Sequence, residues 1–75
     1  MQTLKIGAKW CSACTDLDKL QLSKLKDAIN YDADDDSDII VRYMITKLPT
    51  VIQTDEKGTE LFRYTGKEEI INNFK

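Results

Sequence analysis

Apolar and polar residues alternate near the start of the chain, in the pattern of a half-buried strand. Across residues 3–8, Leu4 and Ile6 fall on one face and Lys5 falls on the other. Because the alternation directs Lys5 away from the apolar face, its side chain is expected to be solvated. A solvated lysine at this position also implies that its face of the sheet is poorly covered.

Further along, apolar residues recur at helical spacing, and turn residues separate the segments. From Cys11 to about Asp27 the chain contains neither Pro nor Gly, and its leucines have the spacing of one helix. The predicted elements are a strand at 3–8, that helix, a short strand at 29–31, a short helix at 38–45 with Ser37 as its N-cap, strands at 50–54 and 59–64 joined by a turn at 55–58, and a terminal helix at 67–74. This order, β-α-β-α-β-β-α, is that of an α/β domain. Four aromatic residues are expected to be buried or half-buried in it: Tyr31, Tyr43, Phe62 and Tyr64.

The size and charge of the chain exclude several classes of protein. With 75 residues and a net charge of −2, it is expected to form one domain, 1–75, and it lacks the strong positive charge of a nucleic-acid binder. No apolar stretch approaches the ~20 residues of a membrane span. Lys5 and Lys9 leave no room for a signal-peptide apolar region, so a cytoplasmic location is expected. Histidine is absent, which excludes Ser-His and Cys-His catalytic pairs.

The negative charge is concentrated in one short stretch. Residues 31–38 carry a charge of −5, whereas the segments before and after carry +2 and +1. The spacing of Asp32, Asp34 and Asp36 matches the first three ligand positions of an EF-hand calcium loop. Ser37 stands where that loop needs glycine, and Tyr43 stands where it needs glutamate. A solvated loop is therefore favoured over a calcium site, and no metal is expected.

The cysteine pair Cys11 and Cys14 is the main candidate for chemistry. A CxxC motif alone is compatible with half of a zinc site, with a redox pair or with chance. A zinc site needs four ligands, and this chain has two cysteines and no histidine. The pair also follows a predicted strand and opens a predicted helix, where backbone N–H groups and Lys9 would stabilise a Cys11 thiolate. Dithiol–disulfide chemistry is thus the favoured interpretation.

Several motifs together resemble the thioredoxin superfamily. They are Trp10-Cys11-Ser12-Ala13-Cys14 after a strand, Leu48-Pro49-Thr50 before a strand, Gly58 in a hairpin, and Tyr64-Thr65-Gly66 before the last helix. The resemblance covers essentially the whole chain, but without the additional N-terminal strand and helix of full thioredoxins. It implies a minimal thioredoxin-like fold with a four-stranded mixed sheet.

The resemblance also implies a role for each site residue. Cys11 would be the nucleophile that attacks a target disulfide, and Cys14 would be the resolving thiol. Pro49 would follow a cis peptide bond and lie against the cysteines, with the backbone of Leu48 available to a bound peptide. The residues expected to line the substrate groove are Trp10, Leu48, Pro49, Thr65 and Gly66.

The chain departs from the family in three ways. Ser12-Ala13 is neither the Gly-Pro of thioredoxins nor the Pro-Tyr of many glutaredoxins. Lys5 stands where thioredoxins carry a buried acid that helps to deprotonate the resolving thiol. Gly66-Lys67-Glu68 only partly matches the glutathione site of glutaredoxins.

The sequence therefore predicts a small monomeric enzyme that reduces protein disulfides through Cys11 and Cys14. It needs no cofactor other than this redox-active pair, and either a reductase or glutathione would supply its electrons. Two alternatives remain open. One is a glutathione-dependent, glutaredoxin-like enzyme, and the other is a binding module that has the same fold without turnover.

Overall fold

The sheet is organised around strand β1 (Gln2–Gly7), which lies between two other strands. A computed structural model describes all 75 residues and orders the strands β2-β1-β3-β4. Strand β1 runs parallel to β2 (Ile29–Asp32) and antiparallel to β3 (Thr50–Thr54), and β3 runs antiparallel to β4 (Glu60–Thr65). The four-stranded mixed sheet expected from the resemblance is confirmed.

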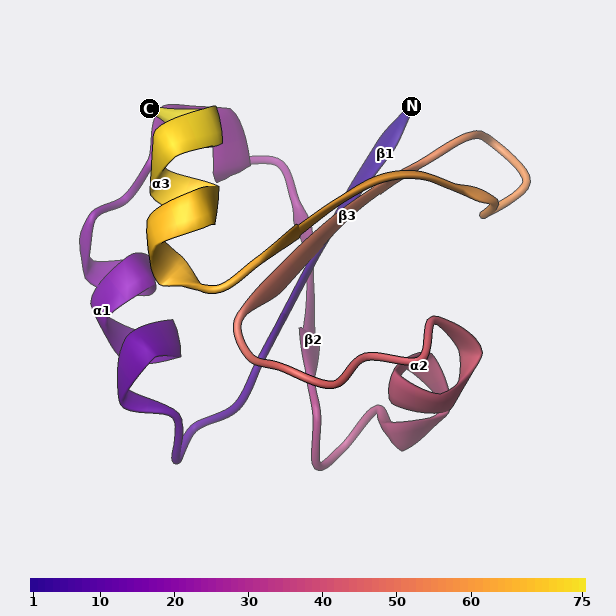
Figure 1. Ribbon diagram of the computed structural model, residues 1–75, viewed down its shortest axis with the longest axis horizontal. Coiled ribbons are helices and arrows are strands. Elements are labelled where there is room, and N and C mark those ends of the chain that lie inside the picture. Colours follow the sequence, from indigo (N-terminus) through magenta and orange to yellow (C-terminus); the bar gives the residue numbers. More distant parts are fainter.

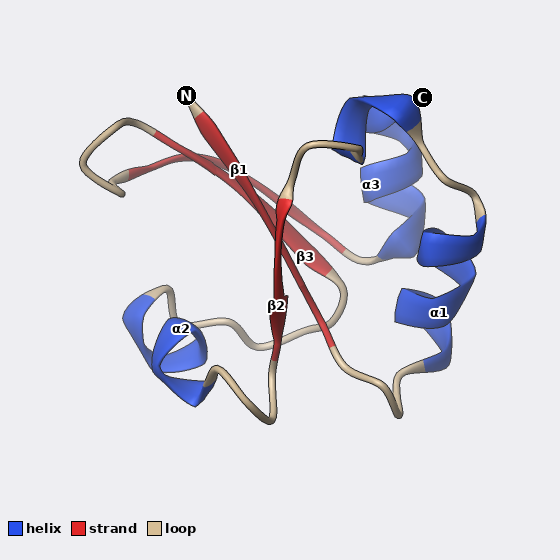
Figure 2. Ribbon diagram, turned by 180° about the vertical axis from the view of Figure 1, so that it is seen from behind, coloured by secondary structure: helices blue, strands red, loops and turns tan.

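Helices cover both faces of this sheet (Figure 1). Helix α1 (Ser12–Lys19) and helix α3 (Lys67–Phe74) lie side by side on one face, with a short 3-10 turn, η1 (Ser23–Leu25), beside them. Helix α2 (Ser37–Arg42) covers the other face, as Figure 2 shows from behind. None of these helices has the length and apolar character needed to cross a membrane.

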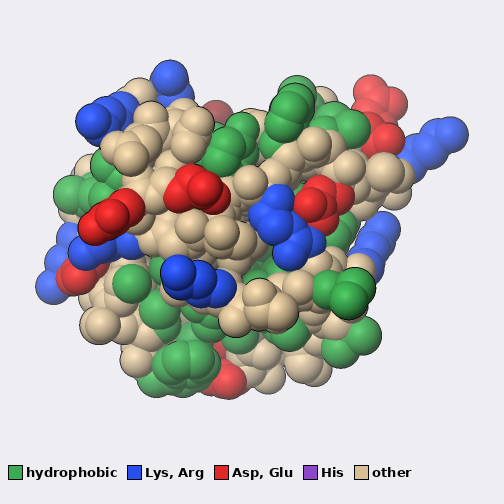
Figure 3. All heavy atoms as spheres, in the orientation of Figure 1, with side chains coloured by type: hydrophobic (Ala, Val, Ile, Leu, Met, Phe, Trp, Pro, Cys, Tyr) green, Lys and Arg blue, Asp and Glu red, His purple; other side chains and the backbone are tan.

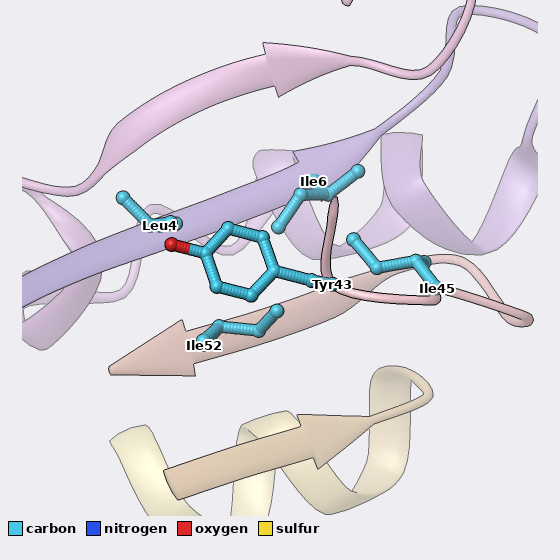
Figure 4. Packing of buried hydrophobic residues seen from close by; sticks show 5 residues of the cluster. All are labelled: Leu4, Ile6, Tyr43, Ile45 and Ile52. Atoms are coloured by element: carbon cyan, nitrogen blue, oxygen red, sulfur yellow. The ribbon is translucent and has the colours of Figure 1, made fainter. Parts of the chain in front are cut away.

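Each face of the sheet has its own apolar cluster. The α2-side cluster consists of Leu4, Ile6, Tyr43, Ile45 and Ile52. Figure 4 shows the Tyr43 ring between the side chains of β1 and that of Ile52 on β3. The α1-side cluster consists of Leu17, Leu25, Val51, Ile70 and Phe74. Successive residues of β3 thus enter opposite clusters, because side chains alternate across a strand, and Val51 and Ile52 are both fully buried.

The first helix is shorter than the sequence pattern predicts. Helix α1 ends at Lys19 rather than near Asp27, and Gln21 adopts a left-handed conformation with φ of 49°. The apolar pattern continues past this break because Leu17 and Leu25 enter the same cluster from two separate helical pieces. Periodicity alone therefore could not reveal the interruption.

The second helix also differs from its prediction at both ends. Ser37 is the first helical residue and not the N-cap, a position that Asp36 occupies. The helix ends at Arg42 rather than Ile45, and Met44 follows in a left-handed conformation with φ of 51°. This turn redirects the chain, so that Ile45 enters the α2-side cluster.

One aromatic prediction is wrong. Tyr43 is buried and two other tyrosines are half-buried, as expected, but Phe62 is 53% exposed. Phe62 pairs with Gln53 near the hairpin that joins β3 to β4. This hairpin extends away from α1 and α3 (Figure 1), so neither of these two helices covers its side chains.

Candidate active site

The two cysteines lie where β1 passes into helix α1. Cys11 is the N-cap residue, with extended backbone angles, and its Sγ accepts a hydrogen bond of 3.2 Å from the backbone N–H of Cys14. The two residues form a disulfide, with their Cα atoms 5.3 Å apart, within the usual range. Cys11 is partly exposed, whereas Cys14 is only 5% exposed. A target disulfide can therefore reach Cys11 more readily than Cys14.

Gly7, which sequence reasoning missed, allows Cys14 to pack against the sheet. A Cβ atom at Gly7 would lie 3.3 Å from both the Cβ and the Sγ of Cys14. That separation is tighter than ordinary van der Waals contact, so a larger residue would push helix α1 away from β1. The sequence signal for this contact is that Gly7 follows Lys5 by two residues and so lies on the same face of the strand, where a residue without a side chain leaves room for a neighbour.

Trp10 is exposed beside the disulfide, as expected, and its indole has a partner that the sequence did not indicate. The ring is 69% exposed, and Nε1 donates a hydrogen bond of 2.9 Å to Asp34 Oδ2. Asp34 belongs to the acidic stretch, 24 residues further along the chain. This hydrogen bond ties the acidic loop to the residue directly before Cys11.

The remaining carboxylates of that loop mostly serve the backbone. Asp32 Oδ1 accepts hydrogen bonds from the backbone N–H groups of Asp34 and Asp35, and Asp36 Oδ2 accepts one of 3.0 Å from the N–H of Asp32. No three acidic or cysteine side chains converge in a group that could hold a metal ion. The local structure is that of a turn capped by its own aspartates.

The segment that begins β3 lies on the other side of the cysteines. The Leu48–Pro49 peptide bond is cis, as expected, and the side chain of Pro49 is fully buried. The carbonyl oxygen of Pro49 accepts a hydrogen bond of 2.8 Å from the N–H of Gly66. Leu48 packs against the α2-side cluster, and Thr65 donates its N–H to Glu69 at 2.5 Å. The structure thus brings Pro49, Thr65 and Gly66 close together.

A cleft of about 510 Å³ opens behind the disulfide. Cys14, Pro49, Lys5 and Asp18 are among the residues that line it. The expectation that Lys5 is freely solvated is wrong, because its side chain is only 20% exposed and its Nζ is paired with a carboxylate oxygen of Asp18. Beside Lys5 this face of the sheet borders the cleft, whereas further along α1 and α3 cover it.

Charges around the site are mixed in sign. Figure 3 shows acidic and basic side chains interspersed over one face of the molecule. Lys9 also lines the cleft, and Lys67 on α3 forms an ion pair of 3.5 Å with Asp16 on α1.

The architecture matches known structures closely. Over 95% of this chain, the fold superimposes on thioredoxin from Malassezia sympodialis (Mala s 13) with a TM-score of 0.78 and 19% sequence identity. Thioredoxin NaTrxh from Nicotiana alata matches 97% of the chain with a TM-score of 0.76 and 19% identity. The chain has the thioredoxin fold.

The match is one of thioredoxin architecture rather than of sequence. Thioredoxin from Trypanosoma brucei brucei, with a TM-score of 0.76, is 21% identical to this chain. No protein-family model and no curated protein sequence matches the chain. The chain spans 67% of the Malassezia thioredoxin, 72% of the Nicotiana one and 66% of the Trypanosoma one. The chain therefore matches about two thirds to three quarters of the length of these thioredoxins.

Proposed function

We propose that this protein is a thiol–disulfide oxidoreductase that reduces protein disulfides through Cys11 and Cys14. The observation that carries the proposal is the asymmetry of the pair. Cys11 is partly exposed at the start of a helix, Cys14 is 5% exposed one turn later, and the two form a disulfide. This arrangement offers one sulfur to a target and keeps the other for an internal second step.

The proposed reaction consists of two disulfide exchanges. The Cys11 thiolate attacks one sulfur of the target disulfide, the target S–S bond breaks, and the second target sulfur leaves as a thiolate that takes a proton. The Cys14 thiolate then attacks Cys11 Sγ, the bond between Cys11 and the target breaks, and the remaining target sulfur leaves. Two electrons pass to the target, two thiols form there, and the Cys11–Cys14 disulfide forms.

Substrate recognition is proposed to use the exposed surface beside Cys11. The ring of Trp10 offers apolar area that is held in place by Asp34. Pro49 has no backbone N–H, so nothing at this position competes for the nearby sulfur atoms. An extended target segment would lie between Trp10 and the segment Leu48–Pro49, with main-chain hydrogen bonds of the kind used in β-augmentation. Thr65 and Gly66 would border the same groove.

Reduction of insulin disulfides tests this function directly. The protein should catalyse the reaction when it is supplied with a reductant, and Cys11→Ser should abolish it. Cys14→Ser should instead accumulate a covalent complex with the target, because the second exchange is blocked. Two separate assays, one with thioredoxin reductase and NADPH and one with glutathione, identify the electron donor. Rapid alkylation of Cys14 in preference to Cys11 at neutral pH would reverse the assigned roles, and absence of any reduction would favour a binding module.

A further inference from the structure

The second exchange requires a proton acceptor, because Cys14 must become a thiolate in a buried position. Cys14 is 5% exposed and packs against the backbone of Gly7. Burial disfavours the charged form of a thiol, and the chain has no histidine to accept a proton. The side chains around the cleft are therefore the candidates for this acceptor.

Two spacings place one ion pair beside Cys14. Cys14 and Asp18 are four residues apart on α1 and therefore lie on the same face of the helix, one turn from each other. Lys5 and Gly7 are two residues apart on β1 and therefore point to the same face of the strand. Gly7 faces Cys14, Lys5 is paired with Asp18, and all four residues line one cleft.

The other titratable groups of the cleft are less suited to accept the proton. They are Lys9 next to the disulfide, Tyr31 and Asp32 on β2, and Asp36 in the following loop. The carboxylates of Asp32 and Asp36 already accept backbone hydrogen bonds. A protonated lysine has no lone pair to offer. Asp18 bonds only to Lys5, and its side chain is 60% exposed, so it can exchange a proton with solvent.

We propose that Asp18 accepts the proton of Cys14 when the mixed disulfide is resolved, with Lys5 as its positioning residue. This proposal rests on the proposed function. The S–H bond of Cys14 breaks, and its proton passes across the cleft to the carboxylate. Asp18 is then a neutral carboxylic acid, so the Lys5 ammonium no longer forms an ion pair with it and faces the new thiolate instead. The thiolate attacks Cys11 Sγ, and the target sulfur leaves as a thiolate. Asp18 then releases its proton to solvent, and the target thiolate takes up a proton from solvent. Lys5, Asp18 and Cys14 together carry no net charge before or after the transfer, so the new thiolate has the Lys5 ammonium as its counter-charge.

A two-phase reaction with the chromogenic disulfide dithiobis(nitrobenzoate) separates the two exchanges. Reduced protein releases a first coloured thiolate when Cys11 attacks, at a rate proportional to reagent concentration. It releases a second when Cys14 resolves the mixed disulfide, at a rate independent of that concentration. Asp18→Asn should slow the second phase at neutral pH by about a hundredfold, the lower end of the range for general acid–base catalysis, and leave the first phase unchanged.

Three further variants complete the test. Asp18→Glu should restore the second phase, because it keeps the carboxylate. Lys5→Met should also slow this phase, and Lys5→Arg should retain it. The pH profile of the second phase should become proportional to hydroxide concentration in Asp18→Asn. A merely structural role would not alter the profile in this way.

Asp16→Asn is the matched control. Asp16 lies on the same helix, is paired with Lys67 on α3, and is exposed to a similar degree. Its substitution should leave both phases unchanged. A second phase that is equally fast in Asp18→Asn and in Asp16→Asn would overturn the inference while leaving the proposed function intact. If the unmodified protein released only one thiolate, the proposed function itself would fail, and the inference with it.

Discussion

The contact between Gly7 and Cys14 can be tested by adding atoms where the structure has no room for them. In Gly7→Val, the first added carbon would already lie 3.3 Å from both Cβ and Sγ of Cys14, and two methyl groups would follow it. Strand β1 cannot yield, because it is paired with β2 on one side and β3 on the other. Helix α1 must therefore shift outward and take Cys14 with it.

The energetic cost follows from two opposed effects. Overpacking of a well-packed site costs about 1–3 kcal/mol. Replacing a strand glycine recovers roughly 0.5–1 kcal/mol of backbone entropy. The midpoints of these two ranges leave a net loss of about 1 kcal/mol, which for a domain of this size lowers the melting temperature by about 4–8 °C. Because Sγ of Cys14 moves relative to Cys11, the second thiolate release should also slow, while the first should not.

Thermal unfolding followed by circular dichroism and the two-phase thiolate assay measure these effects. Thr3→Val is the matched control, because Thr3 shares the strand face of Gly7 but lies at the far end of β1, opposite Gln53. It should change neither quantity. A Gly7→Val protein with unaltered melting temperature and unaltered second phase would refute the close packing of Cys14 against the strand.

Three further predictions concern the core and the recognition surface. Ile52→Val, at a fully buried position, should lower the free energy of unfolding measured by urea titration by about 0.5–1.5 kcal/mol. Its control is Val41→Ala, at a position 77% exposed on α2, which should stay within about 0.5 kcal/mol of the parent. Equal effects of the two substitutions would contradict the assigned core. Tyr43→Phe removes a hydroxyl that donates at 2.6 Å to a hairpin carbonyl and should cost about 0.5–1.5 kcal/mol in the same titration; no loss would show that solvent replaces this bond. Trp10→Ala should raise the KM for insulin without changing the alkylation rate of Cys11, and Asp34→Asn, which only weakens the support of the ring, should raise it less; unchanged KM in both variants would exclude Trp10 from docking.

The fold could be predicted largely from local pattern. The alternation of Leu4 and Ile6 correctly identified the buried face of β1, and the apolar spacing of α3 correctly identified its extent. The breaks at Gln21 and Met44 could not be predicted, because each is a non-glycine residue in a left-handed conformation. Such positions depend on where the following chain must go, and no local signal marks them.

The site was predictable only in part, for a related reason. Cys11, Cys14 and Pro49 could be identified from motifs that are local in sequence. The ion pair of Lys5 with Asp18 spans 13 residues, and the hydrogen bond of Trp10 with Asp34 spans 24. Both depend on the register between elements, which the sequence pattern does not specify. Lys5 was accordingly assigned to solvent, although it lies in the cleft behind the cysteines.

The different roles of the two sulfurs follow from where helix α1 begins. Cys11 precedes the first helical residue, so its backbone is extended and its Sγ accepts a hydrogen bond from the N–H of Cys14, one of the groups that have no partner within the helix. Cys14 lies in the first turn, on the face that packs against Gly7. If the helix began one residue earlier, Cys11 would enter the first turn and lose this setting. The start of the helix thus determines that Cys11 meets the target first. The register of α1 against β1 determines which side chains lie beside the sulfur of Cys14.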